Sequence, residues 1–266
     1  MKHLIYLLPF ILLQSCDGLF EAHPYDGNVT GETDINRKNI SLIEKRCTDK
    51  TTIRFVMIGD TQRRYSETED FVNTINARHD IDFVIHGGDI SDFGLTKEFI
   101  WQRDMLNKLK IPYVVLIGNH DCLATGKYVY QKIFGEKNFS FTAGNVKFIC
   151  LNTNALEYDY SYPIPDFNFI ENERTTSTAN HKKTIVVMHA PPYSEVFNNN
   201  VARTFQAHIK QFPDLQFCLH AHTHNNKAED IFNDGVIYFG SASIEKRNYL
   251  LFTITQNSYT YEVIDF

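Results

Sequence analysis

The sequence predicts an α/β fold, and three patterns in the chain support that prediction. From Ile53 onward, short apolar runs alternate with amphipathic segments of helical period, as in sheets covered by helices. After Gly135, strand-like runs follow one another with only turns between them. Five of the apolar runs end directly before residues that can bind a metal ion, and in open α/β sheets such loops gather at one edge.

The overall charge argues against some classes of partner. The chain has 266 residues and a formal net charge of −6, from 26 basic and 32 acidic residues. It therefore has no general excess of cations, so nucleic acid is not an expected partner. A small phosphorylated substrate stays possible, because bound metal ions would dominate the local field.

The first residues read as an export signal. Lys2 is followed by the apolar stretch Leu4–Leu13, which is too short to span a bilayer, for which ~20 residues are needed. Leu13-Gln14-Ser15-Cys16 resembles a bacterial lipoprotein box. The resemblance implies a signal peptide over residues 1–15, lipidation of Cys16, and an exported protein anchored to a membrane of the bacterial cell envelope. An ordinary secretory signal with an incidental cysteine is the alternative.

Residues 16–50 are predicted to form a tether and N-terminal extension, followed by the main domain over residues 51–266. Within the extension, Ile40, Ile43 and Cys47 have helical spacing, so Asn36–Cys47 forms either a short helix against the domain or part of a linker. No CxxC pair occurs, and Cys150 and Cys218 lie within apolar strand runs, where we expect them to pack as small hydrophobic residues.

The elements of the main domain follow from periodicity. The strands that precede the polar loops are predicted at Ile53–Ile58, Asp82–His86, Tyr113–Ile117, Thr184–Met188 and Gln216–Leu219. Helices are predicted at Glu67–Ala77 and Thr96–Leu109. The turn-linked strands of the second half are expected to form a second sheet, richer in antiparallel pairs; they are Asn138–Thr142, Val146–Leu151, Val236–Phe239, Tyr249–Thr255 and Tyr259–Ile264.

The residues after the strands make a consistent set of metal ligands. They are Asp60, Asp89, Asn119, His189, His222 and His224. Carboxylate and amide oxygens combined with imidazole nitrogens suit Zn, Mn, Fe, Co or Ni, whereas calcium prefers oxygen alone. If the chain stays extended after the last strand, His222 and His224 point to the same side and reach one cluster.

These motifs resemble, in order, those of calcineurin-like metallophosphoesterases. The motifs are Gly59-Asp60, Gly88-Asp89-Ile90-Ser91-Asp92, Gly118-Asn119-His120-Asp121, His189 and Ala221-His222-Thr223-His224. The resemblance implies a four-layer αββα sandwich with two mixed β-sheets. It also implies a hydrolase that cleaves phosphoester bonds with two divalent metal ions and a metal-bound hydroxide.

The same resemblance assigns a role to each residue. Asp89 would bridge two ions, with Asp60 and His224 on the first; Asn119, His189 and His222 would hold the second. His120 would act as the general acid, oriented by Asp121. Such a pair of ions suits in-line displacement at phosphorus.

The chain departs from the family at two positions. The family usually has His two residues after the first Asp, and Gln62 stands here. Gln62 would either give a weaker ligand to the first ion or face away and hydrogen-bond the turn. Asp92 stands where purple acid phosphatases have Tyr, and it would be a functional residue or only a turn former. Arg63 and Arg64 would clasp phosphate or simply be solvated.

The motifs are compatible with more than one class of substrate. We expect a small phosphorylated molecule or a phosphoprotein, with specificity set by loops such as Ser161–Phe169 and Pro191–Asn200. The aromatic residues near Tyr158 would either frame a substrate pocket or cover the edge of the core. A nuclease of the same family and a lipid-anchored binding protein with reduced activity are the rival functions. The sequence gives no oligomeric state.

Overall fold

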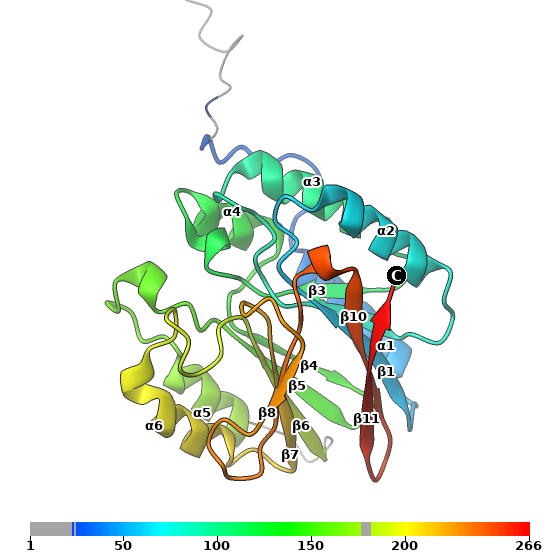
Figure 1. Cartoon of the computed structure of the whole chain (residues 1–266), viewed down its shortest axis with the longest axis vertical. Helices are drawn as coiled ribbons and strands as arrows, with labels where there is room; N and C mark the ends of the chain where they lie inside the picture. The colour runs from blue at the N-terminus through cyan, green and yellow to red at the C-terminus, as the bar shows by residue number, and fades with distance from the viewer. Residues whose placement is uncertain (1–22, 24, 177–181) are drawn as a thin grey trace, which may run out of the picture.

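Two β-sheets pack face to face in the computed structural model, which describes residues 23, 25–176 and 182–266 (Figure 1). The first sheet has the order β11-β10-β1-β2-β3. Its strands are β1 (Ile53–Ile58), β2 (Phe83–His86), β3 (Tyr113–Val115), β10 (Asn248–Ile254) and β11 (Tyr259–Asp265). β1, β2 and β3 run parallel, whereas β10 is antiparallel to both of its neighbours.

The second sheet has the order β4-β5-β6-β7-β9-β8. Its strands are β4 (Phe139–Ala143), β5 (Val146–Leu151), β6 (Lys183–Met188), β7 (Leu215–His220), β8 (Lys227–Glu229) and β9 (Tyr238–Gly240). Both sheets are mixed, as expected. The prediction that the second sheet is richer in antiparallel pairs is wrong, since its three central pairings, from β5 to β9, are parallel. The C-terminal hairpin β10–β11 belongs to the first sheet, because β10 pairs with β1.

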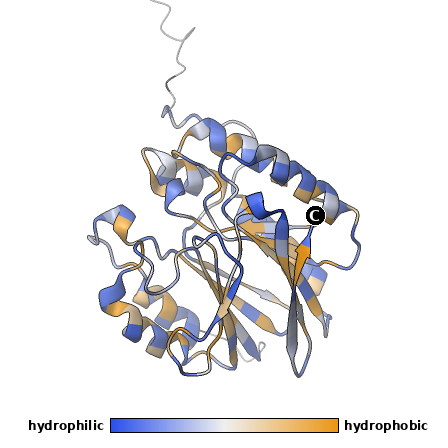
Figure 2. Ribbon diagram, viewed as in Figure 1, coloured by the Kyte–Doolittle hydropathy of each residue, from blue (hydrophilic) through white to orange (hydrophobic). Residues whose placement is uncertain are grey.

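Helices cover the outer face of each sheet and complete the expected four layers. α2 (Tyr65–Asn76), α3 (Thr96–Leu106) and α4 (Gly126–Ile133) pack on the first sheet through one buried apolar cluster. α5 (Phe167–Thr175) and α6 (Ala202–Ile209) pack on the second sheet through another. In the described part of the chain, short 3-10 helices occupy four loops: η1 (His120–Cys122), η2 (Leu156–Tyr158), η3 (Asn199–Val201) and η4 (Ile244–Lys246). Figure 2, coloured by hydropathy, shows helices with both hydrophobic and hydrophilic positions, as expected for helices that pack one face on a sheet.

α5 begins inside the aromatic segment that the sequence left open. Asp166 caps this helix, accepting a hydrogen bond from Phe169 N at 3.0 Å. Phe167 and Phe169 pack against the core of the second sheet, so here the core-edge interpretation is correct. Tyr160 and Tyr162 remain exposed.

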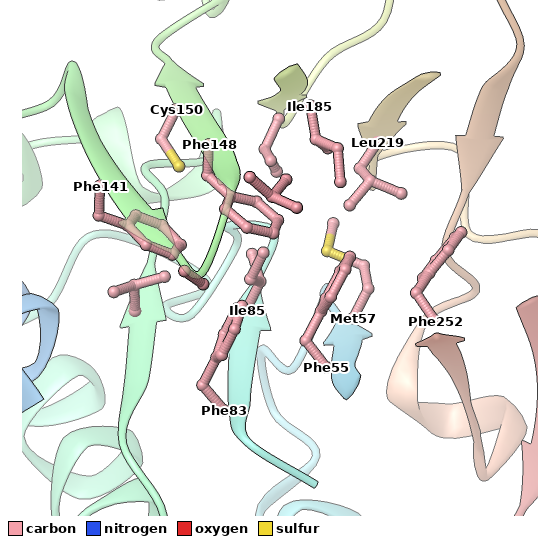
Figure 3. Close-up of a cluster of buried hydrophobic side chains, with 14 of the residues drawn as sticks. Phe55, Met57, Phe83, Ile85, Phe141, Phe148, Cys150, Ile185, Leu219 and Phe252 are labelled. Atoms are coloured by element: carbon pink, nitrogen blue, oxygen red, sulfur yellow. The ribbon is translucent and has the colours of Figure 1, made fainter. Parts of the chain in front are cut away.

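The space between the sheets is filled by large apolar side chains (Figure 3). Phe55 and Phe83 of the first sheet both meet Phe148 of the second edge-on, with ring centroids 5.2 and 5.5 Å apart. Such pairs add about 0.5–1.5 kcal/mol beyond the area they bury. Cys150 also packs in this layer, and Cys218 of β7 packs with the helices on the outer face of the second sheet; both are buried hydrophobic residues, as predicted.

Much of the predicted tether is part of the domain. α1 (Ile35–Cys47) is the helix that the sequence allowed, and it contacts the edge strands β3 and β4. Asn36 pairs with Val115 of β3 as a neighbouring strand would: its Nδ2 donates to Val115 O at 2.8 Å and its Oδ1 accepts from Val115 N at 2.9 Å. Further upstream in the extension, Thr30 O accepts a hydrogen bond from the buried Arg103 side chain at 2.6 Å. The linker alternative is therefore wrong for this part of the chain.

Two other expectations concern the N-terminus and the cysteines. The predicted signal peptide and Cys16 lie outside the described residues. Among the residues that are described, no helix is long and apolar enough to cross a bilayer. In that same part of the chain, Cys47, Cys122, Cys150 and Cys218 are buried and form no disulfide.

Candidate metal centre

Asp60 and Asp89 follow the adjacent parallel strands β1 and β2, and their loops are hydrogen-bonded to each other. Asp60 N donates to Gly88 O and Thr61 N donates to Asp89 O, both at 3.0 Å. Both aspartates have left-handed backbones, with φ of 53° and 58°, and both are 1% exposed. Such conformations cost free energy and concentrate at functional sites. The fold therefore holds two buried carboxylates side by side at the sheet edge.

The loops approach so closely that glycine is required at two positions. Gly88 has φ of 103°, and a Cβ on it would lie 2.7 Å from Gly118 N. A Cβ on Gly118 would lie 2.1 Å from Asp89 Oδ1. These glycines allow the loops after β2 and β3 to converge on one carboxylate.

Asn119, His189 and His222 surround Asp89. His189 Nε2 lies 2.9 Å from Asn119 Oδ1 and 3.4 Å from Asp89 Oδ2, and His222 Nδ1 lies 3.0 Å from Asn119 Oδ1. His189 Nδ1 donates to Gly87 O at 2.9 Å, which leaves Nε2 free for a ligand bond. The potential ligand atoms of Asp89, His189 and His222 lie within 4.8 Å of one another. This group has the composition and spacing of a metal site.

Asp60 and His224 form a second group beside the first, and Gln62 follows Asp60 by two residues. His224 Nε2 lies 3.4 Å from Asp60 Oδ1. Both Asp60 oxygens and Gln62 Oε1 are buried without a hydrogen-bond partner among the described residues. Buried oxygens of this kind are costly unless a cation satisfies them, so this group also fits a metal ion. Gln62 Oε1 makes no hydrogen bond to the turn, contrary to the alternative interpretation of this residue.

The two histidines after β7 reach different groups. The expectation that the chain stays extended there is wrong, because His222 and His224 have φ of 65° and 56° and Thr223 N donates to Ala221 O at 2.7 Å. This turn separates the two rings. As a result, the His222 ring contacts the Asn119 side chain, whereas the His224 ring contacts the Asp60 carboxylate.

The pKa shifts in this group show that its carboxylates attract positive charge. Burial alone would lower the pKa of His189, but the charges of Asp89 and Asp60 outweigh it and raise the pKa to about 9. Burial alone would raise the pKa of Asp89, and His189 holds it below its ordinary value. The buried carboxylates therefore stabilise a positive charge at this position, as a metal site requires.

His120 lies at the edge of this group, and its ring is held by Asp92. Its backbone N donates to Asp89 Oδ1 at 2.9 Å, and its ring Nδ1 lies 2.8 Å from Asp92 O and 3.6 Å from Asp92 Oδ1. Asp92 is buried and accepts from Arg63 Nη2 at 2.7 Å. Asp92 is therefore more than a turn former. Arg63 is exposed to solvent and Arg64 is partly exposed, as one of the two interpretations expected, and each also pairs with a carboxylate: Arg63 with Asp92 and Arg64 with Glu245, the latter at 2.7 Å.

Asp121 does not orient the His120 ring, so that expectation is wrong. Its carboxylate accepts from Asp89 N, Gly118 N, Ile90 N, Ser91 N and Ser91 Oγ, at 2.8–3.0 Å. Burial and the nearby Asp89 charge raise its pKa to about 6. Asp121 thus fixes the loop that carries Asp89.

Glu195 is a site residue that the sequence did not single out. Its Oε1 lies 3.0 Å from His222 Nε2, on the far side of the ring from Asn119. Carboxylates placed in this way often orient metal-binding histidines. The only signal in the sequence was that Glu195 lies in the loop that follows His189.

Comparisons with known proteins agree with this geometry. Residues 53–226 match the family model described as calcineurin-like phosphoesterase. The chain is similar to a 3',5'-cyclic-nucleotide phosphodiesterase from Nostoc sp., with 27% identity over 67% of this chain and 70% of that protein. Its fold is similar to a dimetal phosphatase from Danio rerio, at 10% identity, with a TM-score of 0.67 over 81% of this chain and 98% of that one. It is also similar to GAP50, the anchor in the inner membrane complex of Plasmodium, at 14% identity, with a TM-score of 0.61 over 81% and 85% of the two chains. The chain therefore belongs to the calcineurin-like phosphoesterase family, hydrolases that use a centre of two divalent metal ions.

Proposed function

We propose that this protein hydrolyses a small phosphoester at a dinuclear metal centre. The observation that carries the proposal is the pair of adjacent ligand groups that meet at Asp89. One contains the buried oxygens of Asp60, which have no hydrogen-bond partner among the described residues, and the other contains Asp89, His189 and His222 with their potential ligand atoms within 4.8 Å of one another.

Each group would hold one ion. The assignment places Asp60, Gln62 and His224 on the first ion, Asn119, His189 and His222 on the second, and Asp89 between them. When bound, the two ions supply an activated water and a cationic centre for the phosphoryl group. The protein's contribution is to fix the ligands, through the hydrogen bond from His189 to Gly87 and through the loop held by Asp121.

His120 is assigned the proton transfer. Its Nδ1–H donates to Asp92 O, which turns Nε2 away from Asp92 and fixes the plane of the ring. In the protonated ring, Nε2–H would donate its proton to the leaving oxygen. Asp92 is a positioning residue in this scheme, and Arg63 in turn holds the Asp92 carboxylate.

The substrate is proposed to be a small molecule. The similar protein from Nostoc is a 3',5'-cyclic-nucleotide phosphodiesterase, so cyclic nucleotides are the first substrates to test. A nuclease activity is disfavoured by the net charge of −6. A phosphoprotein substrate remains the other candidate from the sequence.

We also propose export and lipid anchoring through Cys16. This rests on Leu13-Gln14-Ser15-Cys16 after an apolar stretch. Several acyl chains on one cysteine would hold the protein firmly, whereas a single chain gives only marginal binding. The test is Cys16→Ala in the full chain, which should abolish processing and membrane partitioning. Unchanged processing and partitioning would refute the proposal.

The activity is tested on protein loaded with two equivalents of Mn²⁺. Cyclic nucleotides, a linear phosphodiester, a phosphomonoester, pyrophosphate, a phosphoprotein and single-stranded DNA would be compared as substrates. We expect turnover of at least one small phosphoester, lost in Asp89→Ala. Preferential cleavage of DNA would favour the nuclease. Full metal occupancy without turnover of any substrate would favour the binding protein and overturn the proposal.

A further inference from the structure

A hollow of about 380 Å³ lies directly beside the metal centre. One wall is the loop after β6, including Tyr193 and Glu195; the other wall runs from the end of β7 through Thr223 to Glu229. His222 lines both the hollow and the candidate metal site. The volume is in the range of small-ligand pockets. A group attached to a phosphoryl centre at His222 would therefore enter this hollow.

The hollow is rich in hydrogen-bond acceptors and carries negative charge. Glu195 and Glu229 both line it, and none of its described lining residues is Lys or Arg. Thr223 Oγ1 is buried without a hydrogen-bond partner among the described residues. Lys227 pairs with Glu229 at 3.5 Å, but both side chains are about half exposed, so water weakens this pair. Such a lining disfavours an anionic group and favours a cationic one.

Tyr193 presents an aromatic ring to this hollow, and its backbone has an unusual conformation. Its φ is 70°, which is rare for a bulky residue, and its backbone N donates to Asn199 Oδ1 at 2.8 Å. The side chain is nevertheless 52% exposed, with its ring 5.4 Å from that of Phe232. A strained backbone that presents a half-exposed aromatic ring is typical of a binding site. Aromatic faces attract organic cations.

We propose that this hollow binds a cationic, amine-type organic substituent of the phosphoester substrate. The substituent would lie against Tyr193 with its charge near Glu229, while its phosphoryl group lies at the metal centre. The inference rests on the proposed function, since it places a phosphoryl group beside His222.

Two matched ligands test the charge preference without requiring turnover. Phosphocholine carries a quaternary ammonium, and 3,3-dimethylbutyl phosphate is its neutral carbon isostere. Calorimetry on the Mn²⁺-loaded protein should show about tenfold tighter binding of phosphocholine. Tyr193→Ala and Glu229→Gln should each reduce this preference about threefold or more, because each removes one source of attraction for the cation. Glu195 is unsuitable for this test because it also contacts His222.

The control is Glu262→Gln, which neutralises an exposed carboxylate on β11 and should leave the preference unchanged. Equal binding of the two ligands to the parent protein would overturn the inference, as would a preference that survives both pocket variants. Hydrolysis of the 4-nitrophenyl esters of the same two phosphates is measured separately. A binding preference without any turnover would contradict the proposed function and leave the pocket assignment standing, and turnover without a preference would do the opposite.

Discussion

The contact between Asn36 and β3 predicts that α1 is required for the stability of the catalytic domain. Asn36 is 3% exposed, and its amide makes both hydrogen bonds that a neighbouring strand would make to Val115. In Asn36→Ala, the buried Val115 N–H loses its partner, which costs about 1–3 kcal/mol. Val115 O keeps the hydroxyl of Tyr130 at 2.7 Å, so losing its second bond costs only about 0.5–1.5 kcal/mol.

Alanine is a better helix former than asparagine, and this difference offsets about 0.5 kcal/mol of the loss in stability. The expected net loss in the free energy of unfolding is therefore about 1–4 kcal/mol. Urea denaturation followed by circular dichroism measures this loss, provided that the slope of the transition is unchanged. The matched control is Asn168→Ala in α5, where the side chain is exposed and the change should stay within about 0.5 kcal/mol. Equal stability of the two variants would refute the role of α1 and restore the interpretation of this segment as a tether.

Four further predictions concern the site. Asp89→Ala should lose metal from both positions, whereas His120→Ala should keep its metal while the rate falls ~10²–10⁴-fold; equal metal loss in both variants would contradict the assigned roles. Gln62→His should raise the Mn²⁺ affinity of the weaker position in the metal-stripped protein, and a titration with two indistinguishable, unaltered affinities would argue against a weak site. Glu195→Gln should lower the Mn²⁺ affinity of the site that contains His222 about tenfold. This is the small end of the range for residues that orient metal ligands, because Glu195 is exposed. An unchanged metal titration would show that the contact between Glu195 and His222 is incidental. Burial lowers the pKa of His86 to about 3, so below pH ~6.5 the unfolded chain binds a proton at this residue that the native protein does not bind. In the metal-stripped protein, the free energy of unfolding should therefore fall by up to ~1.4 kcal/mol per pH unit toward pH 3, and it should fall less steeply in His86→Gln. Parallel pH profiles of the two proteins would refute this.

The parts of the site that the sequence predicted are those that follow a strand directly. Asp60, Asp89 and His189 come within two or three residues of a buried apolar run, so the strand fixes where each side chain can lie. The errors arose where a turn intervenes. His222 and His224 have left-handed backbones, and their rings contact Asn119 and Asp60, which are far away in sequence.

Pairing partners were harder to predict than the elements themselves. β10 and β11 were expected close to their observed bounds, yet they were placed in the wrong sheet. A hairpin shows the same alternation in either sheet, and the choice depends on β10 pairing with β1, almost two hundred residues earlier. In the same way, the orientation of His120 depends on Asp92, whose buried position results from the packing of its loop rather than from any local pattern.

The position of the metal centre couples it to the packing between the sheets. Asp60 and Asp89 lie on the first sheet, whereas His189 and His222 lie on the second, so neither sheet alone assembles the site. The sheets also touch here, since a Cβ on Gly59 would lie 2.7 Å from the Ala221 Cβ. The aromatic residues between the sheets therefore set the distance between the two halves of the ligand set. Because packed cores tolerate little change of volume, this arrangement keeps that distance nearly constant, and the contacts of His189 and His222 with Asn119 join the two halves directly.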